Sequence, residues 1–288
     1  MGKWENEEMG KLNFMITLRT IVLRTLFLTL LSLSLELFGQ TVWTYNIRYA
    51  NPADGLDIWE NRRDSLSKAI MDFHPDFLGL QEALLSQLQY LDSTLTGYSR
   101  YGVGREDGVN KGEFAPIYFD TKKYKVVSEK TIWLSDSIDH PNKGWDAACE
   151  RIATIVMFKG AREEDTYVVV NSHWDHVGQV ARQNSAKLIL EQIQPYLDRN
   201  MKVIVMGDFN ATQDNQAIKL LKEKLVDSCP ASLEGFGTFN GFKIFPIDEP
   251  RIDYIFHSQN LKTRRYRVLS PKSHGRQASD HYFVQAEF

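Results

Sequence analysis

The stretch VIVMGDFNAT, residues 203–212, joins an apolar run directly to an acid and an amide. The run at 203–206 is typical of a short buried strand. Asp208 and Asn210 follow at the point where that strand ends. A strand closed by a turn rich in Asp and Asn explains the stretch without any function. Catalytic groups held at the rim of a sheet explain it equally, and the rest of the chain has to distinguish the two.

Other segments predict a chain in which strands and helices do not strictly alternate. Apolar residues at three-to-four spacing predict helices at 59–73, 84–95, 179–197 and 215–225. Alternating or short apolar runs predict strands at 41–49, 77–82, 98–103, 114–119, 124–134, 151–159, 166–172, 202–206, 251–257, 263–270 and 281–288. The helices form two groups, each set between strands of one half of the chain. We therefore expect an α/β sandwich, in which sheets pack face to face with helices outside.

Composition and charge describe an ordinary folded domain. The chain has 288 residues, of which 43% are hydrophobic and 25% charged, as in soluble globular proteins. A formal net charge of −3 lacks the overall basic character of most nucleic-acid-binding proteins. The one basic cluster, KTRRYR at 262–267, alternates in a way that predicts an edge or solvent-facing strand.

The N-terminal segment predicts export. Arg19 and Arg24 precede LFLTLLSLSLELFG, residues 26–39, which is short, rich in leucine and ends in a small residue. This order is typical of a secretory signal. The apolar run is too short to span a bilayer, and Glu36 interrupts it. The alternative is an amphipathic helix that tethers the chain to a membrane.

We expect residues 1–39 to be a signal peptide with an extended leader, and residues 40–288 to be one exported domain that is periplasmic, surface-attached or secreted. A start at Met15 remains open because the leader is long for a signal. Cys149 and Cys229 are the only cysteines of the domain, and their spacing matches no metal motif. A secreted protein permits one disulfide between them, and two unpaired thiols are an equal alternative.

Polar residues gather where the predicted strands begin or end. Each one alone is common at a strand end and indicates little. Asp253 differs, because it lies between Ile252 and Tyr254 in an apolar run. A buried carboxylate there needs a cation or hydrogen-bond donors. The whole set is Asn46, Glu82, His173, Asp175, His176, Asp208, Asn210, Asp253, Asp280 and His281.

Taken together, these side chains offer hard oxygen ligands and imidazoles. Carboxylate and amide oxygens suit Mg²⁺, Mn²⁺ or Ca²⁺. Imidazoles and amides beside such an ion can donate to phosphate oxygens as charge accumulates on them. A metal ion, a carboxylate and a histidine are what hydrolysis of a phosphate ester requires.

The motifs TYNIR, LQE, NSHWDH, GDFN, RIDYIF and SDH occur in this order across residues 41–288. In this they resemble the endonuclease/exonuclease/phosphatase superfamily, which has the deoxyribonuclease-I-like fold. The resemblance implies a four-layer αββα sandwich with two packed, mainly antiparallel sheets, which agrees with the reading from periodicity. It also implies a bound Mg²⁺ or Mn²⁺.

The resemblance assigns roles to the metal-binding residues. Glu82 in LQE matches the principal metal ligand of the superfamily. Asn46 in TYNIR matches the amide beside that metal, which helps to hold the ion and the catalytic aspartate. Asp280 in SDH matches an acidic residue at or near the metal. Arg151 matches a position where many relatives carry an arginine or polar residue that faces the substrate. Asp175 and His176 follow His173 closely in the chain, and they either reach the substrate or only fix the loop.

The remaining assignments concern the reaction itself. Asp208 in GDFN matches the group that orients or deprotonates the attacking water, and Asn210 matches a neighbour that contacts the phosphate. His173 in NSHWDH matches a donor to the scissile phosphate. Asp253 and His281 match a hydrogen-bonded pair in which the carboxylate favours the charged imidazole.

The resemblance therefore implies an exported, divalent-metal-dependent hydrolase of phosphoric esters, which acts by in-line attack of water on a phosphodiester or phosphomonoester. The absence of a basic footprint favours a small-molecule substrate, and a nuclease acting on DNA or RNA, either an endonuclease or a 3'-5' exoribonuclease, is the alternative. A catalytically silent binding module would be expected to lack key side chains, and none is missing. We expect no stable membrane span and a monomer. GVGRED, residues 102–107, lacks the lysine of a phosphate-binding loop and is predicted to be a flexible rim loop.

Overall fold

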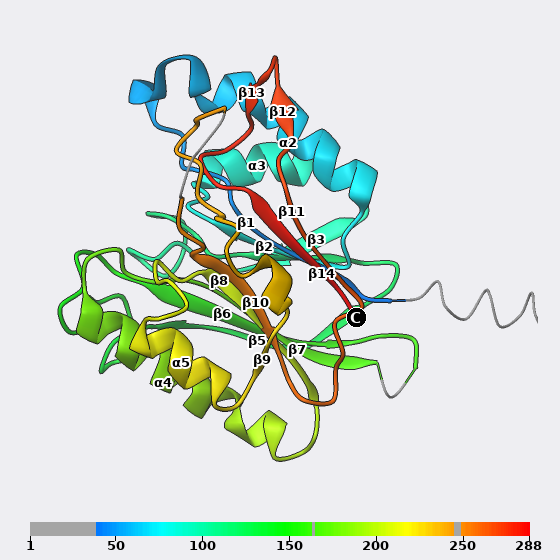
Figure 1. Cartoon of the computed structure of the whole chain (residues 1–288), viewed down its shortest axis with the longest axis vertical. Coiled ribbons are helices and arrows are strands. Elements are labelled where there is room, and N and C mark those ends of the chain that lie inside the picture. Colours follow the sequence, from blue (N-terminus) through cyan, green and yellow to red (C-terminus); the bar gives the residue numbers. More distant parts are fainter. Residues whose placement is uncertain (1–38, 163–164, 245–248) are drawn as a thin grey trace, which may run out of the picture. The chain divides into compact units, whose positions relative to one another are not determined.

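Two six-stranded sheets lie against each other in the computed structural model, which describes residues 39–162, 165–244 and 249–288 (Figure 1). The first sheet has the order β11 (Arg265–Leu269), β14 (Phe283–Glu287), β1 (Thr41–Asn46), β2 (Phe77–Gln81), β4 (Ile117–Asp120) and β3 (Tyr98–Tyr101). The second has the order β5 (Lys125–Trp133), β6 (Ile152–Lys159), β7 (Thr166–His173), β8 (Lys202–Asp208), β10 (Asp253–His257) and β9 (Val226–Asp227). A separate two-stranded ribbon pairs β12 (Lys272–Ser273) with β13 (Arg276–Gln277).

Each large sheet contains one parallel pair, β1 with β2 and β7 with β8, and its other pairs are antiparallel. The sheets are therefore mainly antiparallel, as predicted. Apolar residues of both sheets, among them Phe77, Val169 and Ile204, form the core between them. Strands of both sheets that pack on this core have ends on the same side of the domain.

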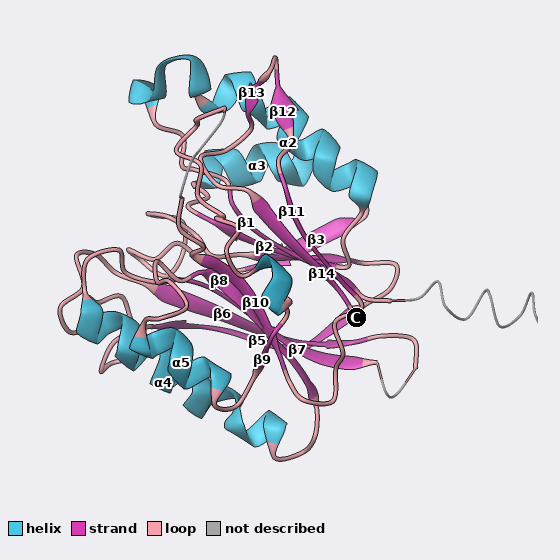
Figure 2. Ribbon diagram, viewed as in Figure 1, coloured by secondary structure: helices cyan, strands magenta, loops and turns pink. Residues whose placement is uncertain are grey.

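Helices cover the outer faces, which completes the predicted four-layer αββα sandwich (Figure 2). Apolar side chains of α2 (Trp59–Phe73) and α3 (Leu85–Thr94) pack on the first sheet. Those of α4 (Gln179–Leu197) and α5 (Gln216–Lys222) pack on the second. Two short 3-10 helices, η1 (Pro52–Asp57), which is kinked at Gly55, and η2 (Ala231–Leu233), lie in connections.

The predicted element bounds differ from the observed ones mainly at strand ends. The predicted helices 59–73 and 179–197 are confirmed, and α2 stops at His74, which has φ 49° and precedes Pro75. The strand predicted at 114–119 begins only at Ile117, because Phe114 forms isolated bridges to other segments instead. The basic strand β11 is an edge strand, as its alternation predicts.

Both cysteines are unpaired thiols in this fold. The predicted signal peptide falls on residues 1–38, which lie outside the described part of the chain, and on Gly39. Among the helices of the described ranges, none combines the length and hydropathy needed to cross a membrane.

Candidate active site

Strand register brings three of the predicted residues together at one sheet edge. Asp208 ends β8 and His173 ends β7, and the parallel pairing of these strands sets the two residues opposite each other. Asp253 begins β10 and is paired with Asp208 in antiparallel register. Gly207 has φ 152°, and a Cβ atom there would lie 1.9 Å from the carbonyl oxygen of Ser172. Glycine is therefore required for the close approach of β7 and β8 beside the site.

Asp208 is the centre of this group and is almost fully buried. One carboxylate oxygen accepts a hydrogen bond of 2.9 Å from the Asn46 amide, and the other accepts one of 3.0 Å from the Asn210 backbone. The Nε2 atoms of His173 and His281 lie 3.5 and 3.7 Å from Asp208 Oδ2. Burial and the nearby Asp253 carboxylate raise the pKa of Asp208 to about 7, against the opposing effect of His281.

His281 forms a buried ion pair with Asp253. Its Nδ1 atom lies 2.9 Å from Asp253 Oδ2. Burial alone would lower the pKa of His281, but the Asp253 and Asp208 carboxylates outweigh it and raise that pKa well above its usual value. The imidazole is therefore charged near neutral pH, with one N–H directed to Asp253 and the other toward Asp208. Asp253 Oδ1 is buried without a hydrogen-bond partner among the described residues.

His173 is the opposite case, a neutral imidazole. Burial, followed by the charges of Arg151 and Arg105, lowers its pKa well below the usual value. The Asn210 amide lies 3.0 Å from His173 Nε2 and also donates to the Trp174 carbonyl at 3.0 Å. A neutral ring that accepts at Nε2 carries its proton on Nδ1, and this atom lies 3.8 Å from Glu113 Oε2. His173 thus connects Asp208 on one ring edge with Glu113 on the other.

The predicted metal ligands also lie close to Asp208, through Asn46. The Asn46 amide donates to both Glu82, at 3.0 Å, and Asp208, at 2.9 Å. Glu82 has φ 60° and accepts a second hydrogen bond of 3.2 Å from the backbone of Tyr49. Asp280 is buried, and desolvation together with the charge of Glu82 raises its pKa.

Arg48 has a place in this site that the sequence did not predict. Its guanidinium lies 3.9 Å from Glu82 and 3.9 Å from Asp280, and it also forms two hydrogen bonds with Asp54. The Glu82 and Asp280 carboxylates therefore lie beside the same positively charged group, and positive charge between them is favourable. Hard carboxylate oxygens that share a cation are the donors that Mg²⁺ or Mn²⁺ requires, so these residues fit such an ion.

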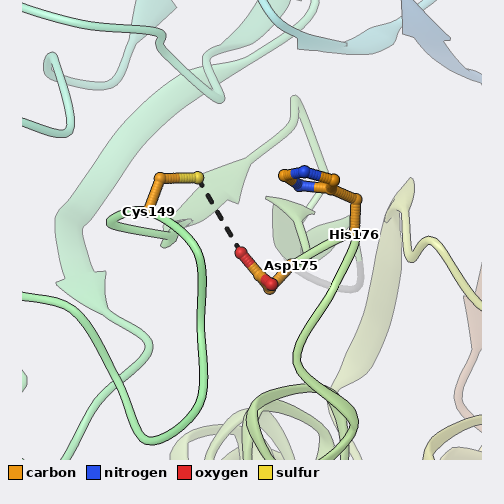
Figure 3. A group of neighbouring side chains, drawn as sticks. All are labelled: Cys149, Asp175 and His176. Carbon is orange, nitrogen blue, oxygen red and sulfur yellow. Dashed lines mark hydrogen bonds between the residues drawn. The ribbon is translucent and has the colours of Figure 1, made fainter.

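A second acid–histidine group lies across the cleft, on loops rather than strands (Figure 3). Cys149, Asp175 and His176 approach one another there, and the Cys149 thiol lies 3.8 Å from Asp175. Asp175 accepts hydrogen bonds from the backbone of Ala148 at 3.0 Å, Val177 at 2.9 Å and Gly178 at 2.7 Å. These bonds lower the pKa of Asp175 to about 2 although burial acts in the other direction.

Arg151 is held by this second group. Its Nε lies 3.5 Å from Asp175 and its Nη2 lies 3.1 Å from Nδ1 of the exposed His176. Its third nitrogen, Nη1, is buried and finds no partner in the described ranges. The Asp175 carboxylate therefore fixes the loop and Arg151.

The groups meet in one cleft with a volume of about 690 Å³. Asn46 and Asp253 do not line the cleft themselves, but they form hydrogen bonds with Asp208 and His281, which do. The sequence missed Arg48, Arg105 and Glu113. Arg48 ends the TYNIR motif, which could have pointed to it, whereas no motif pointed to Arg105 or Glu113 as site residues. Predicted residues that line the cleft are Glu82, Arg151, His173, His176, Asp208, Asn210, Asp280 and His281.

Solved structures of other proteins resemble this chain in both sequence and fold. A mannosyl-6-phosphatase structure from Bacteroides thetaiotaomicron is 35% identical, with a TM-score of 0.79, over 86% of this chain and 98% of that chain. An endonuclease/exonuclease/phosphatase structure from Bacteroides vulgatus is 33% identical, with a TM-score of 0.80, over 87% of this chain and 98% of that one.

A curated relative, Protein angel of Drosophila melanogaster, is 23% identical over 225 residues. That match covers 72% of this chain and 61% of the relative, so the chain spans less than two thirds of the relative's length. The model of the endonuclease/exonuclease/phosphatase family matches residues 43–281. The chain therefore belongs to the endonuclease/exonuclease/phosphatase family and is a hydrolase of that family.

Proposed function

We propose that this protein is a divalent-metal-dependent phosphatase that releases phosphate from small phosphorylated sugars. The observation that carries the proposal is the convergence on Asp208. One amide, Asn46, links it to Glu82, and the charged His281 lies 3.7 Å from the same Asp208 oxygen that Asn46 binds. The 35% identity to a mannosyl-6-phosphatase over nearly that whole chain supports the substrate class.

In this mechanism Asp208 orients the attacking water and accepts its proton. Its pKa of about 7 suits a group that must be ionised before the reaction and must take up a proton during it. The raised pKa of His281 favours its protonated form, so Asp208 is better suited than His281 to act as the base. The Nε2–H of His281 instead stabilises negative charge on the phosphate oxygens, and Asp253 holds the ring in place.

Glu82 and Asp280 would hold Mg²⁺ or Mn²⁺, with Asn46 beside it. When bound, such an ion supplies positive charge that polarises the phosphate and stabilises the leaving oxygen. Asn46 keeps Glu82 and Asp208 at a set separation, because one amide nitrogen bonds both carboxylates.

The buried Arg151 guanidinium in the cleft favours a phosphate that carries two negative charges. Arg151 presents an Nη1 group that is buried without a partner among the described residues. Such a donor is costly to bury unless a ligand completes it. A terminal phosphate, with three free oxygens, offers more acceptors to Arg151 than a diester does.

A panel of esters tests this function. The purified chain is incubated with Mg²⁺ or Mn²⁺ and mannose 6-phosphate, glucose 6-phosphate, inositol phosphates, sphingomyelin, DNA or RNA. We expect phosphate release from the hexose phosphates, and we expect EDTA to abolish it. Cleavage of DNA or RNA with intact hexose phosphates would instead favour a nuclease. Lack of hydrolysis of every ester would favour a silent binding module.

We also propose that the chain is exported. The apolar segment at 26–39, preceded by Arg19 and Arg24, supports this proposal. N-terminal sequencing of the protein from its native cells should find a mature start near Gln40. A start at Met1 or Met15 in the mature protein would contradict export by cleavage.

A further inference from the structure

The loop with the sequence GVGRED lies in the wall of the cleft. Its backbone is hydrogen-bonded on both sides, which differs from the flexible rim loop that its glycines predict. The Trp133 indole donates to the Arg105 carbonyl at 2.7 Å, and the Arg105 amide donates to the Glu113 carbonyl at 3.1 Å. At Gly104 a Cβ atom would lie 2.3 Å from the Lys111 carbonyl oxygen, so only glycine permits this packing.

The same loop is tied to the proposed metal side of the site. Phe114 forms bridges to Gly104 and to Ala83, and its amide donates to the Ala83 carbonyl at 2.8 Å. Ala83 directly follows Glu82, and Phe114 directly follows Glu113. The position of Glu113 is therefore linked to that of Glu82 through one backbone contact.

Arg105 and Glu113 form an ion pair that the catalytic arrangement above does not use. Arg105 Nη1 lies 2.7 Å from Glu113 Oε2, and the two side chains are 14% and 18% exposed. Both residues line the cleft with His173. The pair lies on the Nδ1 edge of the His173 ring, whereas Asp208 faces the Nε2 edge.

Each partner has hydrogen-bonding capacity left over. Arg105 Nε is buried without a partner among the described residues, and no described residue donates to Glu113 Oε1. Burying a charged pair is favourable only when its remaining donors and acceptors are satisfied. Arg48, at the other end of the cleft, differs because Asp54 binds it through two hydrogen bonds.

We propose that the Arg105–Glu113 pair binds hydroxyl groups of the leaving alcohol and so selects phosphate esters of polyhydroxylated alcohols. A guanidinium can only donate hydrogen bonds and a carboxylate can only accept them, whereas a hydroxyl does both. Two neighbouring hydroxyls of a sugar can therefore satisfy both partners at once. The inference rests on the proposed phosphatase function, because it places the phosphate beside Asp208 and the alcohol beyond His173.

The experiment compares two esters of primary alcohols. Mannose 6-phosphate carries hydroxyls on its ring, and cyclohexylmethyl phosphate has a ring of similar size without them. Glu113→Gln and Arg105→Gln should each lower the ratio of kcat/KM for mannose 6-phosphate to that for cyclohexylmethyl phosphate by about tenfold to a hundredfold. Asp72→Asn, which breaks the exposed Lys68–Asp72 pair, is the matched control and should leave the ratio unchanged.

Binding supplies a second readout that does not depend on turnover. In an Asp208→Asn background, Glu113→Gln should weaken the binding of mannose 6-phosphate, measured by calorimetry, and leave the binding of inorganic phosphate unchanged. Thermal unfolding of each variant checks that the fold is intact.

Equal losses on both esters would mean that the pair contacts the phosphate, and would overturn the inference. No loss on either ester would overturn it as well. If the wild-type chain hydrolyses neither ester, the proposed function is refuted, and the inference that rests on it is refuted as well. The wild-type rates and the variant ratios therefore distinguish the two failures.

Discussion

Two acid–histidine groups face the same cleft, and they differ in what their carboxylates bind. In the group of Asp208, Asp253 and His281, the residues lie on or next to strands, and their charges act mainly on one another. In the group of Cys149, Asp175 and His176, the residues lie on loops, and three backbone amides donate to Asp175. Similar side chains therefore serve different purposes.

The pKa values express this difference. Burial without enough donors raises the pKa of Asp208 to about 7, whereas backbone donors lower that of Asp175 to about 2. A carboxylate saturated by amides has little capacity left for chemistry, but it stabilises its loop. Proximity of acids and histidines alone does not identify an active site, because the hydrogen-bond partners of each oxygen decide its role.

The largest expected effect comes from breaking the first group. Asp208→Asn and His281→Ala should each lower kcat by on the order of a thousandfold or more, because each acts on charge that develops in the transition state. Steady-state rates with a hexose phosphate measure this. Circular dichroism should show an intact fold. Rates within tenfold of wild type in either variant would contradict the assignment.

Asp253→Asn tests the support behind His281. The variant keeps the shape of the side chain but removes the charge that favours the imidazolium. We expect kcat to fall by about a hundredfold, with a smaller change in KM. A kcat–pH profile should also show the acidic form of His281 being lost at lower pH than in wild type. An unchanged profile would mean that Asp253 has only a structural role.

Asp175→Asn is the matched substitution in the second group. Its main effect should be on stability, since removing the charge weakens bonds to backbone amides and to Arg151. We expect the free energy of unfolding to fall by about 1–3 kcal/mol, measured in urea. We expect KM to rise by only a few-fold because Arg151 loses its partner. A loss of kcat as large as that of Asp208→Asn would contradict the conclusion that Asp175 has a structural role and Asp208 a catalytic one.

The two groups should also affect stability with opposite dependence on pH. The folded pKa of Asp208 is raised, so its contribution to stability in metal-free protein is full below pH 4 and is lost as pH rises to about 7. The folded pKa of Asp175 is lowered, so its contribution is present above pH 4 and is lost as pH falls toward 2. Urea unfolding of wild type and the two Asn variants across this range measures both slopes, and equal signs would refute the comparison.

The smallest effect is expected at Cys149. Its pKa is raised, mainly by burial, so the thiol stays protonated and cannot act as a nucleophile at neutral pH. Cys149→Ala should change kcat/KM by less than about threefold. Loss of activity on alkylation of the thiol in wild type, but not in this variant, would reflect a bulky group in the cleft. Loss of activity in the variant itself would require a role for sulfur.

Much of the fold was readable from local pattern. The bounds of α2 and α4 follow from helical spacing, and the strand segments follow from alternation or short apolar runs. The edge position of β11 follows from its alternating basic residues. Strand ends were less well predicted, because bridges such as those of Phe114 depend on partners distant in sequence.

Within the candidate site, the sequence by itself determined which acids, amides and imidazoles sit at strand ends. The motifs around Asn46, Glu82 and Asp208 carry that information because a short strand and the residue that ends it are local in the chain. The tertiary structure alone decided how the charges are paired. Arg105 meets Glu113, and the Ala148 amide and Arg151 meet Asp175, through contacts that no spacing rule describes. Burial and hydrogen bonding, which set the pKa of a carboxylate, exist only once the loops and both sheets have come together.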